Sequence, residues 1–157
     1  MKKVLYLLIT AGMLLVGCGT NGNKNLDLVS YDNAEIKSEI KKDDFHPKLP
    51  TEVPFKVEDA EASADPFNDK MVTVDFFGEG NHLSLTIFKG ETSYQDDNEY
   101  EEVKIGEIKA KYRLNKADTK TLKWEENGIS YNLGYLSQQS EEKVTKEELM
   151  AVAESFE

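Results

Sequence analysis

The chain has 157 residues and a formal net charge of −11 at pH 7, from 30 acidic and 19 basic residues. A surface of this charge repels phosphates, which argues against a nucleic-acid partner and against docking of the folded part on an anionic lipid surface. The one cysteine, Cys18, cannot form a disulfide within the chain, so the fold must rest on an apolar core.

Residues 1–17 have the composition of a secretory signal peptide. Lys2 and Lys3 come first, and a mostly apolar run over residues 4–16 follows them. The run is shorter than the ~20 apolar residues that a membrane-spanning helix needs. Removal of residues 1–17 would take away two cations and no acidic residue, which changes the net charge from −11 to −13.

The run Leu15, Val16, Gly17 and Cys18 resembles the lipobox of bacterial lipoproteins. The resemblance implies that Cys18 receives a thioether-linked diacylglycerol, becomes the mature N-terminus and anchors the protein to the extracytoplasmic face of the cell membrane. Two acyl chains give stable anchoring where one chain is marginal. The alternative is a free thiol in a secreted protein, which we consider less favourable because an exposed lone cysteine is reactive.

Residues 18–33 are polar and rich in glycine and asparagine, and they predict a lipidated flexible tether. Residues 34–157 then form a single extracytoplasmic domain. Ile36 and Ile40 lie four positions apart, which predicts a short helix over residues 34–42.

Three prolines, at positions 47, 50 and 54, exclude regular structure from the next segment. We expect residues 49–55 to be extended and to lie along the edge of a sheet. Phe55 and Val57 are expected to begin the first strand, because apolar residues recur at every second position from there.

Turn residues at 78–81, 106–107 and 127–128 divide the following part into hairpins. Each turn sets apolar residues opposite one another, so all of them fall on one face of the sheet. The predicted pairs are Phe76 with Leu83, Val74 with Leu85, Val72 with Ile87, Ile105 with Ile108, Val103 with Ala110, Trp124 with Tyr131 and Leu122 with Leu133.

The chain ends in a predicted helix, whose first turn carries a capping box formed by Thr145 and Glu148. An apolar stripe follows, which must dock on the sheet because a helix this short is marginal in water. The stripe consists of Leu149, Val152, Ala153 and Phe156. The predicted fold is therefore α+β, an antiparallel sheet of about six to seven mostly hairpin-connected strands with a C-terminal helix packed on one face.

Residues 122–133 and 147–156, together with residues 49–55, resemble an uncharacterised domain family found in lipoproteins of Gram-positive, spore-forming bacteria. Similar domains lie outside the membrane behind anti-sigma-factor helices. The family has no established catalytic residues, so the resemblance implies none in this chain.

Few residues are candidates for catalysis or metal binding. His46 and His82 are the only histidines, and neither has a ligand or nucleophile at a recognisable spacing, although a Ser-His-acid triad stays open. Asp96, Asp97 and the acids after them could supply oxygen ligands for Ca²⁺, but their order does not match an EF-hand loop. We interpret this cluster as a solvated acidic loop. We therefore expect no enzyme, no cofactor and no metal site.

Four aromatic residues, Tyr112, Trp124, Tyr131 and Tyr135, could form a binding surface, but at strand spacing they are more often cross-strand pairs under a helix. We expect a binding or sensory module whose partner is an unidentified envelope protein or ligand. The alternative is a carrier or chaperone for an apolar ligand in a groove between sheet and helix. A tightly filled interior would argue against a carrier.

Overall fold

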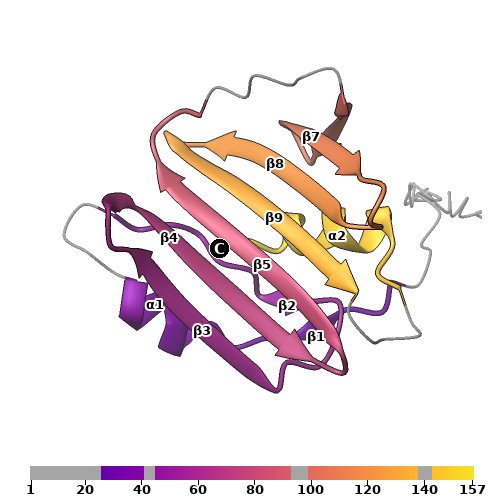
Figure 1. Cartoon of the computed structure of the whole chain (residues 1–157), viewed down its shortest axis with the longest axis horizontal. Helices are drawn as coiled ribbons and strands as arrows, with labels where there is room; N and C mark the ends of the chain where they lie inside the picture. The colour runs from indigo at the N-terminus through magenta and orange to yellow at the C-terminus, as the bar shows by residue number, and fades with distance from the viewer. Residues whose placement is uncertain (1–25, 41–44, 93–98, 138–142) are drawn as a thin grey trace, which may run out of the picture.

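The computed structural model describes residues 26–40, 45–92, 99–137 and 143–157. Cys18 and the pair Asp96 and Asp97 lie outside these ranges. Within them, the chain forms a seven-stranded antiparallel sheet in the order β3-β4-β5-β9-β8-β7-β6, and a small sheet in which β1 pairs with β2 (Figure 1). The elements are β1 (Val29–Ser30), α1 (Ala34–Ile40), β2 (Glu52–Val53), β3 (Asp59–Asp65), β4 (Asn68–Gly78), β5 (Asn81–Lys89), β6 (Glu101–Ile105), β7 (Ile108–Leu114), β8 (Lys120–Glu126), β9 (Ile129–Ser137) and α2 (Lys146–Glu154).

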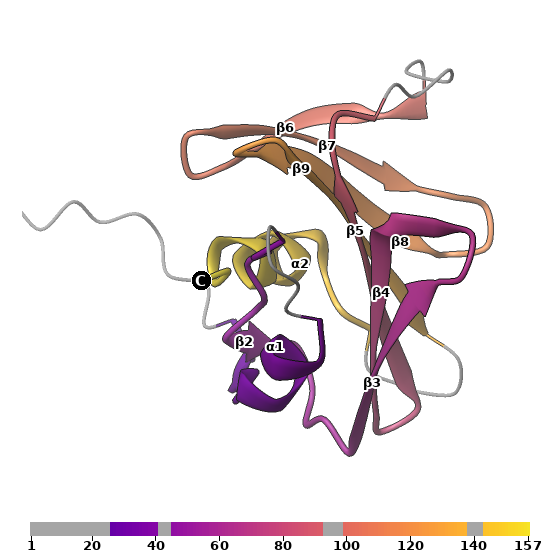
Figure 2. The same ribbon diagram turned by 90° about the vertical axis from the view of Figure 1, so that its left-hand side faces the viewer.

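Both helices and the small sheet lie on the same side of the large sheet (Figure 2). The predicted α+β fold with a C-terminal helix on one face of an antiparallel sheet is therefore confirmed. None of the helices in the described ranges is long and apolar enough to cross a membrane.

The predicted hairpin registers are confirmed at all three turns, since each of the seven predicted residue pairs is a pair of Cα partners. The backbone at two turns explains why the register is so well determined. Glu79 and Gly80 both have positive φ, as do Asn127 and Gly128. Two-residue turns of this type match the twist of the flanking strands and leave no freedom to slip.

The first strand of the sheet differs from the prediction. Phe55 and Val57 precede it, and β3 begins at Asp59. In β3 acidic and serine residues alternate with alanines, a composition with little apolar signal. Such a strand is stable here because it lies at the edge and needs a partner on one side only, which is β4.

Residues 49–55 do not lie along the edge of the sheet, as the sequence suggested. They cross its covered face, where the side chains of Leu49, Val53 and Phe55 are buried. The backbone of Leu49 exchanges two hydrogen bonds with that of Glu157, with N···O distances of 3.2 and 3.1 Å. The C-terminal residue, and not an edge strand of the large sheet, therefore provides the backbone hydrogen-bond partner of Leu49.

The folded part also begins earlier than residue 34, the boundary drawn from the sequence. Val29 and Ser30 pair with β2. The ring of Tyr31 meets that of Phe76 edge-on at 5.2 Å. The buried side chain of Asn33 donates to the carbonyl of Pro50 at 3.0 Å. Residues 26–33 are thus part of the domain rather than of a tether.

Helix α2 begins with the predicted capping box, in which Glu148 N–H donates to Thr145 Oγ1 and Thr145 N–H donates to the Glu148 carboxylate. The helix ends at Glu154, so Phe156 lies beyond it and is not the last member of a helical stripe. Phe156 instead reaches the core through an isolated bridge to Pro50.

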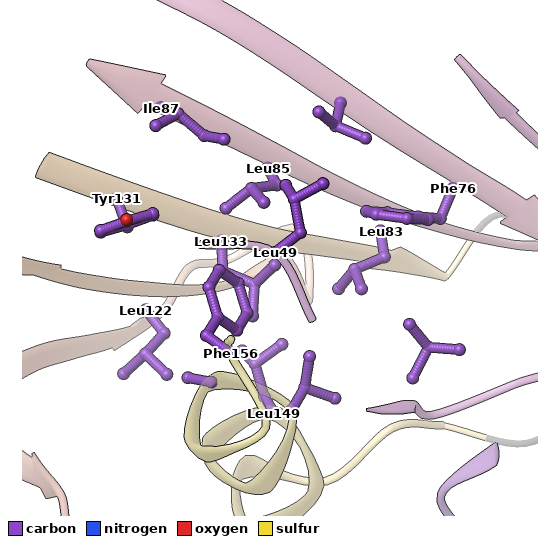
Figure 3. Packing of buried hydrophobic residues seen from close by; sticks show 14 of the residues in the cluster. Leu49, Phe76, Leu83, Leu85, Ile87, Leu122, Tyr131, Leu133, Leu149 and Phe156 are labelled. Atoms are coloured by element: carbon purple, nitrogen blue, oxygen red, sulfur yellow. The ribbon is translucent and has the colours of Figure 1, made fainter. Parts of the chain in front are cut away.

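The space between the sheet and α2 is filled by apolar side chains that point toward one another from both layers (Figure 3). Leu85 and Leu133 from the sheet, Leu149 from α2 and Leu49 from the crossing segment are each 0% exposed. Strands β4, β5, β8 and β9 and helix α2 therefore share one core.

Candidate functional site

The large sheet has a second face, opposite α2, which we call the open face because no described helix lies on it (Figure 2). Successive side chains of a strand point to opposite faces, so the neighbours of the buried core residues point outward here. Across the central strands many of these outward residues are polar and half-buried, and Met71, Phe77 and Phe88 are apolar exceptions. They form a row of Cα partners, Thr73, Thr86 and Asn132. The alternation therefore gives one face that packs into the core and a second, more polar face that is left to solvent or a partner.

Charge on the open face is unevenly distributed. The edge formed by β3 and β4 carries Asp59, Glu61 and Asp75. The opposite edge, formed by β6, β7 and β8, carries five cations at outward positions. These are Lys104, Lys109, Lys111, Arg113 and Lys123. A chain with a net charge of −11 thus gathers a quarter of its basic residues on one end of one face.

The open face is concave at this basic end. A depression of about 1050 Å³ lies over β6, β7 and β8, and Lys104, Lys109, Lys111 and Lys123 line it. We call it the basic hollow. Glu102 and Glu125 also belong to its lining, and so do Val103, Ile108, Trp124 and Glu126, whose side chains point to the covered face, so that these four border the hollow at the level of the strand backbone. The hollow therefore combines positive charge with hydrogen-bond acceptors.

Two of these carboxylates are held by neighbours. Glu126 pairs with the ammonium group of Lys48 at 2.8 Å. Glu125 accepts from the backbone N–H of Thr92 and from the hydroxyl of Ser130, each at 3.1 Å. The Glu125 carboxylate is therefore kept in place at the rim of the basic hollow, whereas that of Glu126 lies toward the covered face.

An aromatic side chain organises the cations beside the hollow. The ring of Tyr100 lies 4.9 Å from the Arg113 guanidinium carbon and 4.8 Å from Lys123 Nζ. Glu99 pairs with Arg113 at 3.4 Å. Within the described part of the chain, Arg113 Nε is buried and has no hydrogen-bond partner. The Arg113 guanidinium therefore keeps one donor for which these residues offer no acceptor.

The residues singled out from the sequence are scattered. His46 is exposed in the segment before β2. His82 lies on the open face, where its Nε2 pairs with Asp75 at 2.8 Å and its ring stacks on Phe77 at 4.6 Å. In residues 26–40, 45–92, 99–137 and 143–157, no group of three or more histidine, cysteine or acidic side chains could hold a metal ion.

The acids after Asp97 serve structural contacts. Glu101 pairs with Lys146 at 2.7 Å and so connects β6 to the first turn of α2. The aromatic residues proposed as a possible surface all face the core side. Trp124 stacks on Tyr131 with ring centroids 5.0 Å apart, and Tyr135 donates to buried Asn81 at 2.6 Å.

The basic hollow was not found from the sequence. Its signal is visible there, since Lys109, Lys111 and Arg113 alternate with apolar residues along a predicted strand. The acidic net charge of the whole chain concealed this local pattern. Only the order of the strands brings Lys104 and Lys123 to either side of it.

One known family matches the chain over most of the large sheet and over α2. The family described as Domain of unknown function (DUF4367) matches residues 68–156, which run from β4 to the end of the core at Phe156 and make up more than half of the chain. No curated protein and no solved structure matches the chain.

Proposed function

The chain belongs to the domain of unknown function family DUF4367, and from that premise we propose that it is a binding or sensory module, lipid-anchored through Cys18 on the extracytoplasmic face of the cell membrane. Its partner is an envelope protein or ligand, and no catalytic step is part of the proposal. The open face of the sheet is the binding surface.

One observation carries this proposal. The covered face carries the packed core, whereas the open face presents a hollow of about 1050 Å³ lined by charged side chains. Charged residues that line a concave surface favour recognition of a partner over burial in a core.

The alternative function, a carrier for an apolar molecule, has less support. Such a carrier needs an apolar groove between sheet and helix, and that space is occupied by leucines with no exposed surface. The basic hollow lies on the other side of the sheet and is lined by four lysines. Its chemistry suits a polar or charged ligand.

The anchor is tested by replacing Cys18. We expect Cys18→Ala to move the protein from the membrane fraction to the soluble fraction, or to leave an uncleaved precursor, because the acyl chains supply the membrane affinity. Cell fractionation followed by immunoblotting measures this. A cleaved Cys18→Ala protein that stays in the membrane fraction would contradict the anchor.

The binding function is tested by cross-linking in native membranes, followed by recovery of the protein and identification of what is attached. We expect a partner that is recovered with the wild-type chain and lost when Lys109 and Lys111 are both replaced by glutamine. The matched control is Lys56→Gln, since Lys56 is exposed and lies outside the basic hollow. Recovery of the same partner with all three proteins would show that the open face is not the binding surface.

A further inference from the structure

We propose that the basic hollow binds an extended acidic segment of a partner protein, in which acidic side chains occupy alternate positions. This inference rests on the proposed binding function and adds the chemistry of the partner.

The spacing of the cations supports an extended ligand. Lys109, Lys111 and Arg113 occupy alternate positions of β7 on one face of the sheet. Alternate residues of a strand are about 7 Å apart, in the sheet and in an extended peptide alike. Three acidic side chains at positions i, i+2 and i+4 of such a peptide therefore match the three cations in spacing.

The sheet places like charges opposite one another at this site. Lys104 and Lys109 are direct Cα partners across β6 and β7. Lys111 and Lys123 are direct partners across β7 and β8. Like charges in this arrangement destabilise a sheet, and departures of this kind are expected where a surface serves function. An anionic ligand between the strands offsets the repulsion.

Lys111 and Lys123 also interact with other groups of the protein. The inference therefore rests on the gathering of five cations and on their spacing, and it does not require any of them to lack a partner.

The lining of the hollow favours a peptide over a more highly charged polymer such as polyphosphate. A polyphosphate would meet two carboxylates, those of Glu102 and Glu125, which occupy outward positions beside the lysines. A peptide supplies backbone N–H donors for these carboxylates, which a polyphosphate does not have. The mixed lining therefore matches a segment that carries acids on one side and amides along its length.

The test uses the full chain with its anchor, purified in a non-ionic detergent. The probe is a fluorescent ten-residue peptide in which glutamate alternates with threonine, and anisotropy measures its binding. We expect its affinity to exceed by about tenfold that of a peptide with the same residues arranged as a glutamate block and a threonine block. We also expect the affinity to fall as salt concentration rises.

Protein variants test the site itself. Lys109→Gln and Lys111→Gln should each weaken binding by about fivefold or more, while Lys56→Gln should leave it unchanged. Thermal unfolding of each variant verifies that it is folded, and Lys109 is exposed, so its replacement leaves the core intact. Equal affinity for the two peptides, or binding that is insensitive to both lysine replacements, would overturn the proposal.

Two further measurements separate other occupants. Tighter binding of inorganic polyphosphate than of the alternating peptide at equal charge would assign the hollow to polyanions in general. Self-association of the full chain without peptide, abolished by Lys109→Gln, would assign it to the acidic strand β3 of a second copy. Either result overturns the proposal.

The failure of this inference can be told apart from failure of the binding function. If a partner is recovered from native membranes but the alternating peptide is not preferred, the binding function is supported and only the acidic segment is contradicted. If no partner is recovered and the alternating peptide is not preferred, both the binding function and the acidic segment are contradicted.

Discussion

Tyr131 connects three parts of the molecule that are far apart in the sequence. Its ring stacks on Trp124 within the sheet and meets Phe156, from the chain end, edge-on at 5.7 Å. Its hydroxyl accepts a hydrogen bond from the backbone N–H of Lys48 at 3.1 Å. One buried tyrosine thus holds the sheet, the crossing segment and the C-terminus together.

Because Tyr131 is buried, the free energy of unfolding is expected to depend on pH in the alkaline range. Burial raises the pKa of Tyr131, and the hydrogen bond from Lys48 opposes that change. The unfolded chain therefore loses this proton first, near the ordinary tyrosine pKa of about 10. The stabilisation that depends on the protonated hydroxyl is fully present below that pH and is lost as the pH rises through the higher folded-state pKa.

We expect Tyr131→Phe to reduce the slope of the unfolding free energy against pH between about pH 9.5 and pH 11. Urea titrations at several pH values measure the slope in both proteins. Burial also raises the pKa of Tyr31 and Tyr112, so part of the decline should remain in the variant. Equal slopes in the two proteins would contradict the role of Tyr131.

At the scale of elements, the two chain ends complete the covered face. Residues 26–33 reach it through β1 and Asn33, and the C-terminus reaches it through Phe156 and Glu157. The crossing segment at residues 49–55 lies between them and exchanges hydrogen bonds with both. These short pieces have almost no regular structure, yet they cover one side of the domain.

A truncation tests whether residues 26–33 belong to the fold. We expect a fragment that begins at residue 34 to lose about 2–4 kcal/mol relative to one that begins at residue 26, because the Pro50 carbonyl loses its donor and Tyr31 leaves Phe76. Denaturant unfolding of both fragments measures the difference. Equal stability of the two fragments would show that residues 26–33 do not contribute to the fold.

At the scale of the whole molecule, charge is separated on the open face. The β3 and β4 edge is acidic and the β6 to β8 edge is basic, although the chain as a whole is strongly acidic. The net charge of the whole chain therefore does not indicate the local charge at the β6 to β8 edge. Lys104 and Lys109 are like charges placed directly opposite each other, an arrangement that destabilises a sheet.

We expect Lys104→Glu to stabilise the protein by about 0.2–1 kcal/mol, because it turns a repulsive pair with Lys109 into an attractive one. Chemical denaturation at low salt measures the change, and added salt should diminish it. The control is Lys56→Glu, which changes the net charge equally at an exposed position outside the hollow. A stability gain of the same size in the control would show that the opposed pair is not the cause.

Features that depend on near neighbours could be predicted from the order of the amino acids alone. The three hairpin registers follow from turn residues and alternating apolar positions, and the cap of α2 follows from Thr145 and Glu148. These interactions span a few residues along the chain, so the local pattern contains all the partners.

Other features depend on contacts between segments that are far apart in the chain. The backbone of Thr51 finds its acceptor at Ser155, and Asn33 donates to Pro50, pairings that no local pattern contains. The basic hollow arises because β6, β7 and β8 are neighbours, which sets two pairs of lysines opposite each other. Strand order and chain crossings depend on the shape of the filled core. They place residues by contacts across the whole chain, and these contacts exist only once the core has formed.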